Sequence, residues 1–391
     1  MPINKRTIII LFLAISLLNT WPLWNWLSSL NQKPVTFSVF LPPISDDNHP
    51  VLITEEFITP DFKGKIAHAS SICELSDGRL AAAWYAGSRE GAKDVAIYFA
   101  ICAPREGMSW TKPRAIVNRN SASKELHRFV KKVGNSIIFA DSEDRLWLIY
   151  VTITVGGWSG SSLNLKISDD SGLTWTQSQR LTLSPFFNVS ELVRNNPLPM
   201  KDGGFGIPIY HECLGKFPEM LWIRVEKADQ RITLKKTRMS GGRMLIQPSV
   251  VVYDSHFAAA FCRNCSDDRT VGMAFTSDIG KSWSKPHMLC LPNPDSALNT
   301  LLLSKGKILL AFNDSKQTRN NLSLAVSPDG GTNWIRIAKI ENKPGEEFSY
   351  PYMIRGLDGK IHLVYTWCRK RIKHVTFNEN WIKTKIKKAL K

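Results

Sequence analysis

The sequence lacks the short signatures of metal sites and of nucleic-acid-binding domains. It contains no His-x-x-His or His-Glu-x-x-His pattern and a single Cys-x-x-Cys pair, Cys262 with Cys265. A zinc site built from cysteines needs two such pairs, or one pair with matching histidines. Zinc-finger, helix-turn-helix and RNA-binding patterns are absent as well. We therefore predict no metal, no cofactor and no nucleic-acid partner.

A compact disulfide framework is also missing. The chain has seven cysteines, an odd number that cannot pair completely, and their spacing is irregular. Buried thiols or one bridge explain them, and an oxidising compartment stays open as an alternative.

Acidic residues are few compared with basic ones. The 391 residues include 51 Lys and Arg but only 34 Asp and Glu, which gives a formal net charge of +17. With nucleic acid set aside, this excess suits an anionic membrane surface or an acidic substrate. Part of it belongs to a basic tail, residues 383–391, which we expect to be solvated or to face lipid.

Long hydrophobic runs are confined to the N-terminus. Lys5 and Arg6 precede an apolar stretch, residues 7–18, and three tryptophans follow by residue 26. This pattern predicts that residues 1–29 are a transmembrane signal-anchor, with the rest of the chain on the non-cytoplasmic side (periplasmic, extracellular or lumenal). A cleaved signal peptide, followed by secretion, is the alternative.

Helical periodicity is absent beyond that segment. Residues 30–65 are rich in proline and predict an extended linker. From residue 66 onward, short apolar runs alternate with Gly and Asp turns, which indicates β-strands. Residues 81–84 are apolar on both faces, as in a strand that lies between two sheets.

One octapeptide pattern, Ser/Thr-x-Asp-x-Gly-x-x-Trp, occurs at residues 168–175, 276–283 and 327–334. In such a turn the Asp bonds backbone N–H groups, the Gly takes a positive φ and the Trp anchors the turn in apolar surroundings. The last two copies lie about 50 residues apart and the first two about twice that, a spacing typical of propeller blades. With a degenerate copy at residues 103–110 and one unmarked unit, the sequence predicts a six-bladed β-propeller over residues 66–382.

These turns resemble the Asp boxes, or BNR repeats, of the sialidase superfamily, and the resemblance extends over roughly residues 60–381. It implies exo-hydrolysis of a terminal acidic sugar from a glycan. It also implies three arginines that bind the sugar carboxylate, a tyrosine nucleophile paired with a glutamate, and an acidic residue that protonates the leaving group. The boxes themselves identify the fold and carry no catalytic role.

Three residues resemble members of that site. Arg263 and Arg319 resemble the second and third arginines, and a guanidinium fork suits a carboxylate better than an ammonium group does. Tyr350, before Pro351, resembles the nucleophile. A phenol suits a substrate with a carboxylate on the reacting carbon, because that carboxylate would repel a carboxylate nucleophile. A surface ion pair for each arginine, and a core position for the tyrosine, are the structural alternatives.

Two positions depart from the family pattern. His68-Ala69-Ser70 stands where the first arginine of an Arg-Ile-Pro motif is expected, and Gln247 stands where the glutamate is expected. A glutamine cannot take the proton of a phenol, whose ordinary pKa is about 10. We assign His68 and Gln247 to substrate binding.

Other ionisable residues are candidates for the missing groups. Glu90 or Asp94 is the predicted acid, in a segment that also carries Arg89. His211 and Glu212 place an imidazole beside a carboxylate, and Arg371 is a candidate for the missing positive charge. Each of these residues is equally compatible with a solvated turn. A propeller that binds a carbohydrate without cleaving it, and a scaffold for partner proteins, remain as alternative functions.

Overall fold

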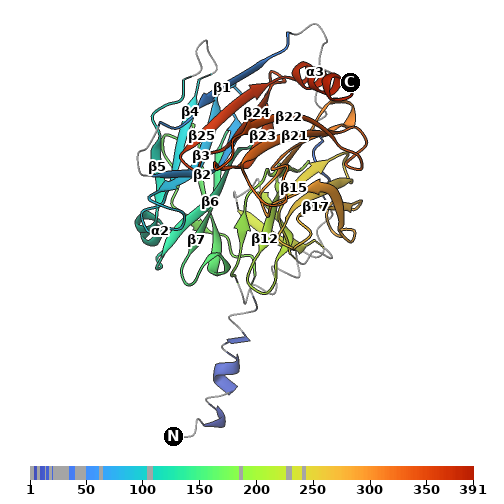
Figure 1. The fold of residues 1–391 in the computed structure, drawn as a ribbon. Coiled ribbons are helices and arrows are strands. Elements are labelled where there is room, and N and C mark those ends of the chain that lie inside the picture. Colours follow the sequence, from blue (N-terminus) through green and yellow to red (C-terminus); the bar gives the residue numbers. More distant parts are fainter. Residues whose placement is uncertain are drawn as a thin grey trace.

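The computed structural model describes residues 4–6, 9–13, 15–16, 20, 35–39, 50–60, 65–103, 109–184, 188–225, 231–239 and 244–391. Most of the described chain forms six antiparallel sheets arranged as blades around one axis (Figure 1). Four of these blades are built from consecutive strands that pair in sequence order. The exceptions are blade III, where β10 and β11 both pair with β12, and the closing blade described below. The predicted six-bladed β-propeller is confirmed.

The first three blades have the following strands. Blade I contains β2 (Ile66–Glu74), β3 (Leu80–Gly87), β4 (Ala96–Cys102) and β5 (Arg114–Asn118). Blade II contains β6 (Lys132–Ala140), β7 (Leu146–Ile153), β8 (Ser161–Ser168) and β9 (Gln179–Arg180). Blade III contains β10 (Leu192–Val193), β11 (Leu198–Pro199), β12 (Phe205–His211), β13 (Phe217–Val225) and β14 (Ile232–Arg238).

The remaining blades complete the ring. Blade IV contains β15 (Leu245–Val252), β16 (Ala258–Asn264), β17 (Thr270–Thr276) and β18 (His287–Pro292). Blade V contains β19 (Asn299–Leu302), β20 (Ile308–Phe312), β21 (Asn321–Ser327) and β22 (Ile335–Asn342). Blade VI contains β23 (Phe348–Arg355), β24 (Ile361–Trp367), β25 (Arg371–Phe377) and β1 (Ile53–Phe57).

Strand β1 closes the ring from the N-terminal side. It pairs antiparallel with β25, from Ile53 opposite Phe377 to Phe57 opposite Lys373, and so forms the outer edge of the last blade. This strand lies inside the segment for which the prolines predicted only an extended linker. A segment far from blade VI in sequence thereby ties the two ends of the propeller together.

A second part of that segment is held against the propeller at Phe37. Its side chain is fully buried beside Trp222. Its N–H donates to the carbonyl of Ser255 at 3.1 Å, and it forms a bridge with Met200. Ser255 lies in the turn before β16, whereas Arg263 lies near the end of that strand. Phe37 is therefore attached to the face of the propeller opposite Arg263.

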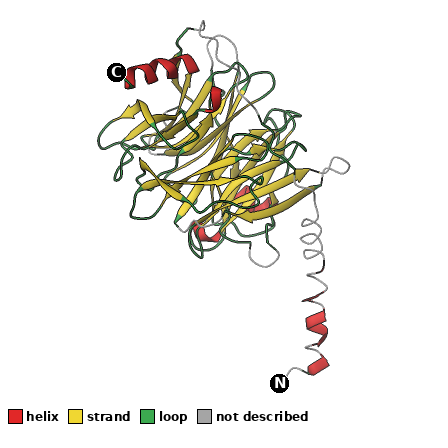
Figure 2. Ribbon diagram, turned by 90° about the vertical axis from the view of Figure 1, so that its right-hand side faces the viewer, coloured by secondary structure: helices red, strands yellow, loops and turns green. Residues whose placement is uncertain are grey.

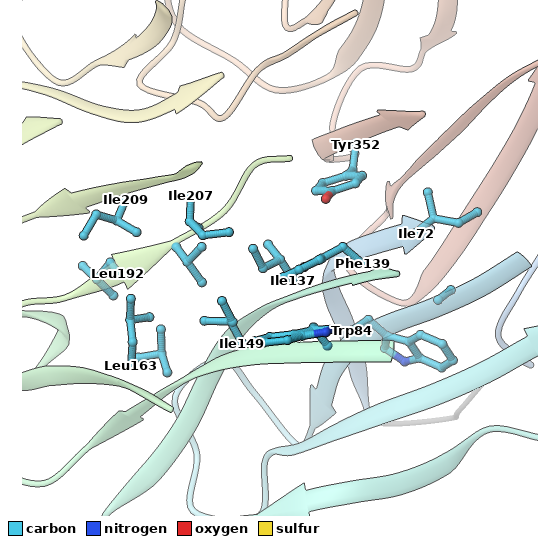
Figure 3. Packing of buried hydrophobic residues seen from close by; sticks show 14 of the residues in the cluster. Ile72, Trp84, Ile137, Phe139, Ile149, Leu163, Leu192, Ile207, Ile209 and Tyr352 are labelled. Atoms are coloured by element: carbon cyan, nitrogen blue, oxygen red, sulfur yellow. The ribbon is translucent and has the colours of Figure 1, made fainter. Parts of the chain in front are cut away.

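Apolar side chains fill the space between neighbouring blades. Ala81, Ala82 and Ala83 of β3 are fully buried, and such small residues let adjacent sheets approach closely. Larger side chains fill the next layer, where Trp84 of blade I, Ile149 of blade II and Ile207 of blade III belong to one cluster (Figure 3). Burial of each such side chain stabilises the fold by about 1.5–3 kcal/mol.

The Asp boxes are tight turns, as predicted. In the box of blade IV, Asp278 accepts bonds from the N–H of Ser282 at 2.9 Å and from its hydroxyl at 2.6 Å. The Thr276 hydroxyl accepts from the N–H of Gly280, which has φ 75°, and Trp283 is 5% exposed. Thr276 pairs with Ala258 at the start of β16. The box and Arg263 therefore lie at opposite ends of the blade.

Two short helices depart from the all-strand expectation (Figure 2). Helix α2 (Arg119–Glu125) connects blades I and II, and Asn118 caps it by accepting from the N–H groups of Asn120 and Ser121. Helix α3 (Glu379–Ala389) begins after Asn378, which caps it through Trp381 N–H. The predicted propeller extends to residue 382, but Trp381 lies in α3 and packs on Phe377 of blade VI. Much of the predicted basic tail is helical as well.

The predicted transmembrane helix is not established. Among the described residues, no helix is both long enough and apolar enough to cross a membrane. Most of residues 17–34 lie outside the described part of the chain. The described apolar residues Ile9 to Leu13 are exposed.

Candidate functional site at the propeller axis

In the described part of the chain, four blades have a bulge in their innermost strands, in blade II between Gly134 and Ser136, and three of these bulges contain a non-glycine residue with a positive φ. In those three the pairing register shifts between His68 and Ser71, between Ile246 and Ser249, and between Ser349 and Tyr352. The residues with a positive φ are Ala69 (52°), Gln247 (51°) and Tyr350 (56°). A bulge redirects the side chains around it. In this way blades I, IV and VI bring His68, Gln247 and Tyr350 together.

Arg263 of blade IV is fixed against this group. Its Nε donates to Asp295 Oδ1 at 2.7 Å. Its Nη1 lies 3.2 Å from Gln247 Oε1 and 3.5 Å from the Tyr350 hydroxyl. Burial would raise the pKa of Asp295, but Arg263 outweighs it and lowers that pKa. The pair is thus charged, with the guanidinium directed at the phenol.

Two more guanidinium groups converge on Glu347. Arg319 Nη1 lies 3.5 Å from Glu347 Oε1, and Arg369 Nη1 lies 3.2 Å from Glu347 Oε2. Arg319 also lies 6.0 Å from the ring centre of Tyr350. Burial alone would raise the pKa of Glu347, but the Ser349 hydroxyl and both guanidinium groups lower it below its usual value. Blades IV and V therefore supply two arginines beside Tyr350, and blade VI supplies a third, Arg369, that shares Glu347 with Arg319.

Glu90 reaches the site from blade I. Its carboxylate is paired with Arg369 Nη2, and both side chains are about one-third exposed. Burial and the neighbouring Glu90 raise the pKa of Tyr85, so this phenol is neutral. Asp94, the other predicted acid, bonds the N–H and hydroxyl of Ser88 at 2.9 and 2.8 Å and is exposed. Glu90, rather than Asp94, joins the arginine cluster.

Tyr350 lies over His68. Their ring centres are 4.5 Å apart with the planes at 62°, and Tyr350 is 8% exposed. His68 is fully buried, and neither of its ring nitrogens has a hydrogen-bond partner among the described residues. Burial, then the charges of Arg369 and Arg319, lower the pKa of His68 well below its usual value. A neutral imidazole therefore supports the tyrosine ring from within the protein.

Gln247 links Arg263 to Tyr210. Because arginine only donates, the Gln247 atom facing Arg263 is the carbonyl oxygen, and its NH₂ group faces the Tyr210 hydroxyl at 3.1 Å. The phenol oxygen of Tyr210 accepts this bond and another from Asn135 at 3.3 Å. Burial raises the pKa of Tyr210, which is neutral. The glutamine thus makes no bond to Tyr350, in keeping with the absence of a base at this position.

His211 and Glu212, at the end of β12, lie in two different environments. Burial raises the pKa of Glu212, and Arg263 and Asp295 are close enough to affect it, which places this carboxylate at the edge of the cluster. His211 stacks on Phe217 with ring centres 4.6 Å apart, and its Nε2 accepts from the N–H of Leu214. Burial, Lys236 and Arg238 lower the pKa of His211. His211 faces blade III and does not join the arginines.

Two predicted arginines lie elsewhere. Arg371 donates from Nε to the carbonyl of Thr59 at 3.0 Å, and its guanidinium carbon lies 3.5 Å from the ring centre of Phe57. It therefore stabilises the closing strand. Arg89 is exposed on the loop that carries Glu90. The charge that the sequence assigned to Arg371 is supplied instead by Arg369, two residues earlier.

Sequence reasoning missed three members of the site: Arg369, Glu347 and Asp295. Arg369 lies in the loop after β24 with φ 55°, within the run Arg369-Lys370-Arg371. That basic run was a signal, but it did not distinguish the loop residue from the first residue of β25. Asp295 and Glu347 lie in connections between blades and had no motif of their own.

The cluster places three guanidinium groups near a phenol, and each of them is paired with a carboxylate: Arg263 with Asp295, Arg319 with Glu347, and Arg369 with Glu90 and Glu347. Guanidinium forks of this kind suit recognition of a carboxylate. Nothing in it resembles a metal site: within the described ranges, no three His, Cys, Asp or Glu side chains are grouped to hold an ion.

The BNR repeat-like domain family matches residues 78–363, which is most of the chain. The protein belongs to the BNR repeat-like domain family. The match covers all three Asp boxes and blades II to V in full. A comparison with curated proteins finds no significant relative.

Solved structures share the fold at low sequence identity. A Hadza microbial sialidase has a TM-score of 0.65 at 15% identity over 80% of this chain, which spans 65% of that protein's length. A Dyadobacter fermentans protein of unknown function has a TM-score of 0.65 at 11% identity, covering 83% of this chain and 99% of its own. The intramolecular trans-sialidase from Ruminococcus gnavus, solved with oseltamivir carboxylate, has a TM-score of 0.60 at 14% identity, covering 81% and 95%. The chain is sialidase-like in fold.

Proposed function

We propose that the protein is a sialidase-like exo-glycosidase that releases a terminal acidic sugar, a sialic acid or a related sugar acid, from a glycan. One observation carries the proposal: Arg263 and Arg319 lie beside Tyr350 at the axis, and Arg369 joins them through Glu347. Each guanidinium has a fork of donors that can bind the oxygens of a substrate carboxylate in exchange for its present carboxylate partner. The solved structures that share the fold include sialidases, which supports the same substrate class.

We assign a role to each group. The Tyr350 oxygen attacks the anomeric carbon and its phenol proton passes to water, while the bond to the leaving oxygen breaks and the protonated Glu90 carboxyl donates its proton to that oxygen. A substrate carboxylate that binds Arg369 competes with Glu90 for the same guanidinium, which frees the Glu90 carboxyl to face the leaving group. Arg263, 3.5 Å from the phenol oxygen, stabilises negative charge as it develops there. Water then releases the sugar from the covalent intermediate.

A second function is supported by Gln247. Its amide bonds Arg263 and Tyr210, so no carboxylate base at this position accepts the proton of Tyr350. A tyrosine without a base is a weak nucleophile near pH 7. The alternative is a propeller that binds an acidic glycan and does not cleave it.

The two functions are separated by screening residues 30–391 against fluorogenic sialosides, uronides and ulosonates. For the enzyme we expect turnover of at least one of these glycosides, with a loss of about 1000-fold or more in Tyr350→Phe. Tyr253→Phe is the matched control, because the Tyr253 hydroxyl donates to the carbonyl of Gly330 on the face of the propeller that carries the Asp boxes, the box face. Glycan-array binding without released sugar would support the binding propeller, and turnover unchanged in Tyr350→Phe would contradict the proposed nucleophile.

We also propose that residues 1–29 attach the protein to a membrane and leave the propeller on the non-cytoplasmic side. The apolar run of residues 7–18 and the basic residues before it support this. Since Phe37 is bound to the box face, the site would then face away from the attachment. The full chain should stay in the membrane fraction after carbonate washing, and a chain starting at residue 30 should not. Release of both chains from the membrane fraction by the carbonate wash would contradict membrane attachment.

A further inference from the structure

The three axial bulges share a common support in blade III. Ala69, Gln247 and Tyr350 have positive φ values, which side-chain-bearing residues rarely adopt unless their surroundings hold them there. Gln247 and Tyr350 also precede prolines, which restricts their backbones further. The bulges come from three different blades. Contacts that connect these three blades are therefore needed to hold the bulges in position relative to one another.

Arg194 reaches two of them. It follows β10, is fully buried, and extends across the axis. Its Nη1 donates to the carbonyl of Ser70 at 3.0 Å, and its Nη2 donates to the carbonyls of Tyr350 and Pro351, the latter at 3.1 Å. One guanidinium therefore joins the bulges of blades I and VI.

Asn195 reaches the third. Its Nδ2 donates to the carbonyls of Gln247 at 2.9 Å and Pro248 at 3.0 Å. Its Oδ1 accepts from Asn299 Nδ2 at 3.2 Å, which fixes the orientation of the amide. Two adjacent residues that follow β10 thus bind the backbone of all three bulges.

The charge of Arg194 is not used for an ion pair. Within the described part of the chain no carboxylate is paired with it, and its guanidinium lies 5.3 and 5.6 Å from the ring centres of Tyr350 and Tyr352. Burial lowers the pKa of Arg194 to about 10, so it stays protonated at neutral pH. A buried guanidinium without a counter-charge is costly, and its fork of donors is what the three carbonyls need.

We propose that Arg194 and Asn195 are positioning residues that hold His68, Gln247 and Tyr350 in their arrangement at the axis. Arg194 fixes the bulges of blades I and VI, and Asn195 fixes the bulge of blade IV. What the positioned groups do rests on the proposed function above. Which bulge each of the two residues fixes does not depend on the proposed function, and it is tested separately.

Amide hydrogen exchange, read by mass spectrometry on residues 30–391, tests that division. Arg194→Met should speed exchange about tenfold or more in segments 67–71 and 349–353 and less in 246–250, since only the first two lose a donor. Asn195→Ala should speed exchange most in segment 246–250 and less in segments 67–71 and 349–353. Arg194→Lys and Asn195→Ser are the milder variants if either protein fails to fold. Asn164→Ala is the matched control, because the fully buried Asn164 bonds carbonyls of Tyr150 and Ser162 within blade II alone.

The same variants are then assayed with the glycoside that the wild type cleaves. We expect kcat to fall about 100-fold in Arg194→Met, partial recovery in Arg194→Lys, and little change in Asn164→Ala at a similar melting temperature. Exchange that rises equally in all three segments, or in none, would overturn the positioning role. Absence of turnover in the wild type would count against the proposed function and leave the exchange result decisive for the positioning role.

Discussion

The two faces of the propeller hold their carboxylates in different ways. On the box face, Asp170, Asp278 and Asp329 bond groups within four residues of themselves, so each turn is complete within its own blade. On the site face, Glu90 bonds Arg369, 279 residues away, and Asp295 bonds Arg263 of the neighbouring blade. A substitution on the box face should therefore act locally on stability. A substitution at the axis should act on several blades and on function.

The largest effect that sharpens this contrast is expected at Arg319. In Arg319→Ala the site loses a guanidinium next to Tyr350 and Glu347, and we expect kcat/KM for an acidic glycoside to fall about 1000-fold. Arg336→Ala is the matched control in the same blade, because Arg336 is half-exposed and pairs only with Asp314 among the described residues. Equal kinetics in the two variants, measured with one substrate series, would break the contrast.

Glu90→Gln should have the next largest effect. The amide cannot donate the proton that the leaving oxygen needs, so turnover of a natural glycoside should fall about 100-fold. An aryl glycoside with an acidic leaving group should lose much less, since it departs without help. Asp94→Asn is the control, because the Asp94 carboxylate accepts from Ser88 and has no arginine partner among the described members of the cluster. We expect this variant to turn over both substrates at nearly the wild-type rate. If both substrates lose activity to the same degree, Glu90 is not the acid.

A box substitution should change stability alone. Asp278→Ala removes the bonds to the N–H and hydroxyl of Ser282, and we expect about 1 kcal/mol lower stability in urea unfolding. Turnover at a temperature where the variant is folded should match the wild type. A drop in kcat would mean that the two faces are coupled.

The smallest effect concerns pH and the box of blade II. The hydroxyl and N–H of Thr174 and the hydroxyl of Ser168 lower the pKa of Asp170 to about 2. Since the unfolded value is about 3.9, this contribution to stability is complete above pH 4 and is lost as the pH falls toward 2. Melting curves of wild type and Asp170→Asn should converge over that window. A constant difference would argue against a native-state bond to the ionised carboxylate.

These differences explain what could be read from the sequence. The Asp boxes are local, so their spacing predicted the turns and the number of blades. Arg263, Arg319, Tyr350 and Glu90 were found through their position relative to these boxes. Arg369 was missed in favour of Arg371 because Arg369 lies in the turn before β25 with φ 55°, where the strand pattern does not predict the direction of a side chain. Arg371 instead lies over Phe57 of β1. Arg194 carries no motif, because its partners are backbone carbonyls of distant blades.

The central claim is that the axis binds a carboxylate through three guanidinium groups. Isothermal titration of N-acetylneuraminic acid and of its methyl ester against residues 30–391, at one ionic strength, tests it most directly. The two ligands differ only in the charge of the group that the arginines are proposed to bind. We predict that the free acid binds about 100-fold more tightly than the ester and that Arg319→Ala removes most of this preference. Equal affinity for acid and ester, or binding of neither, would contradict the account.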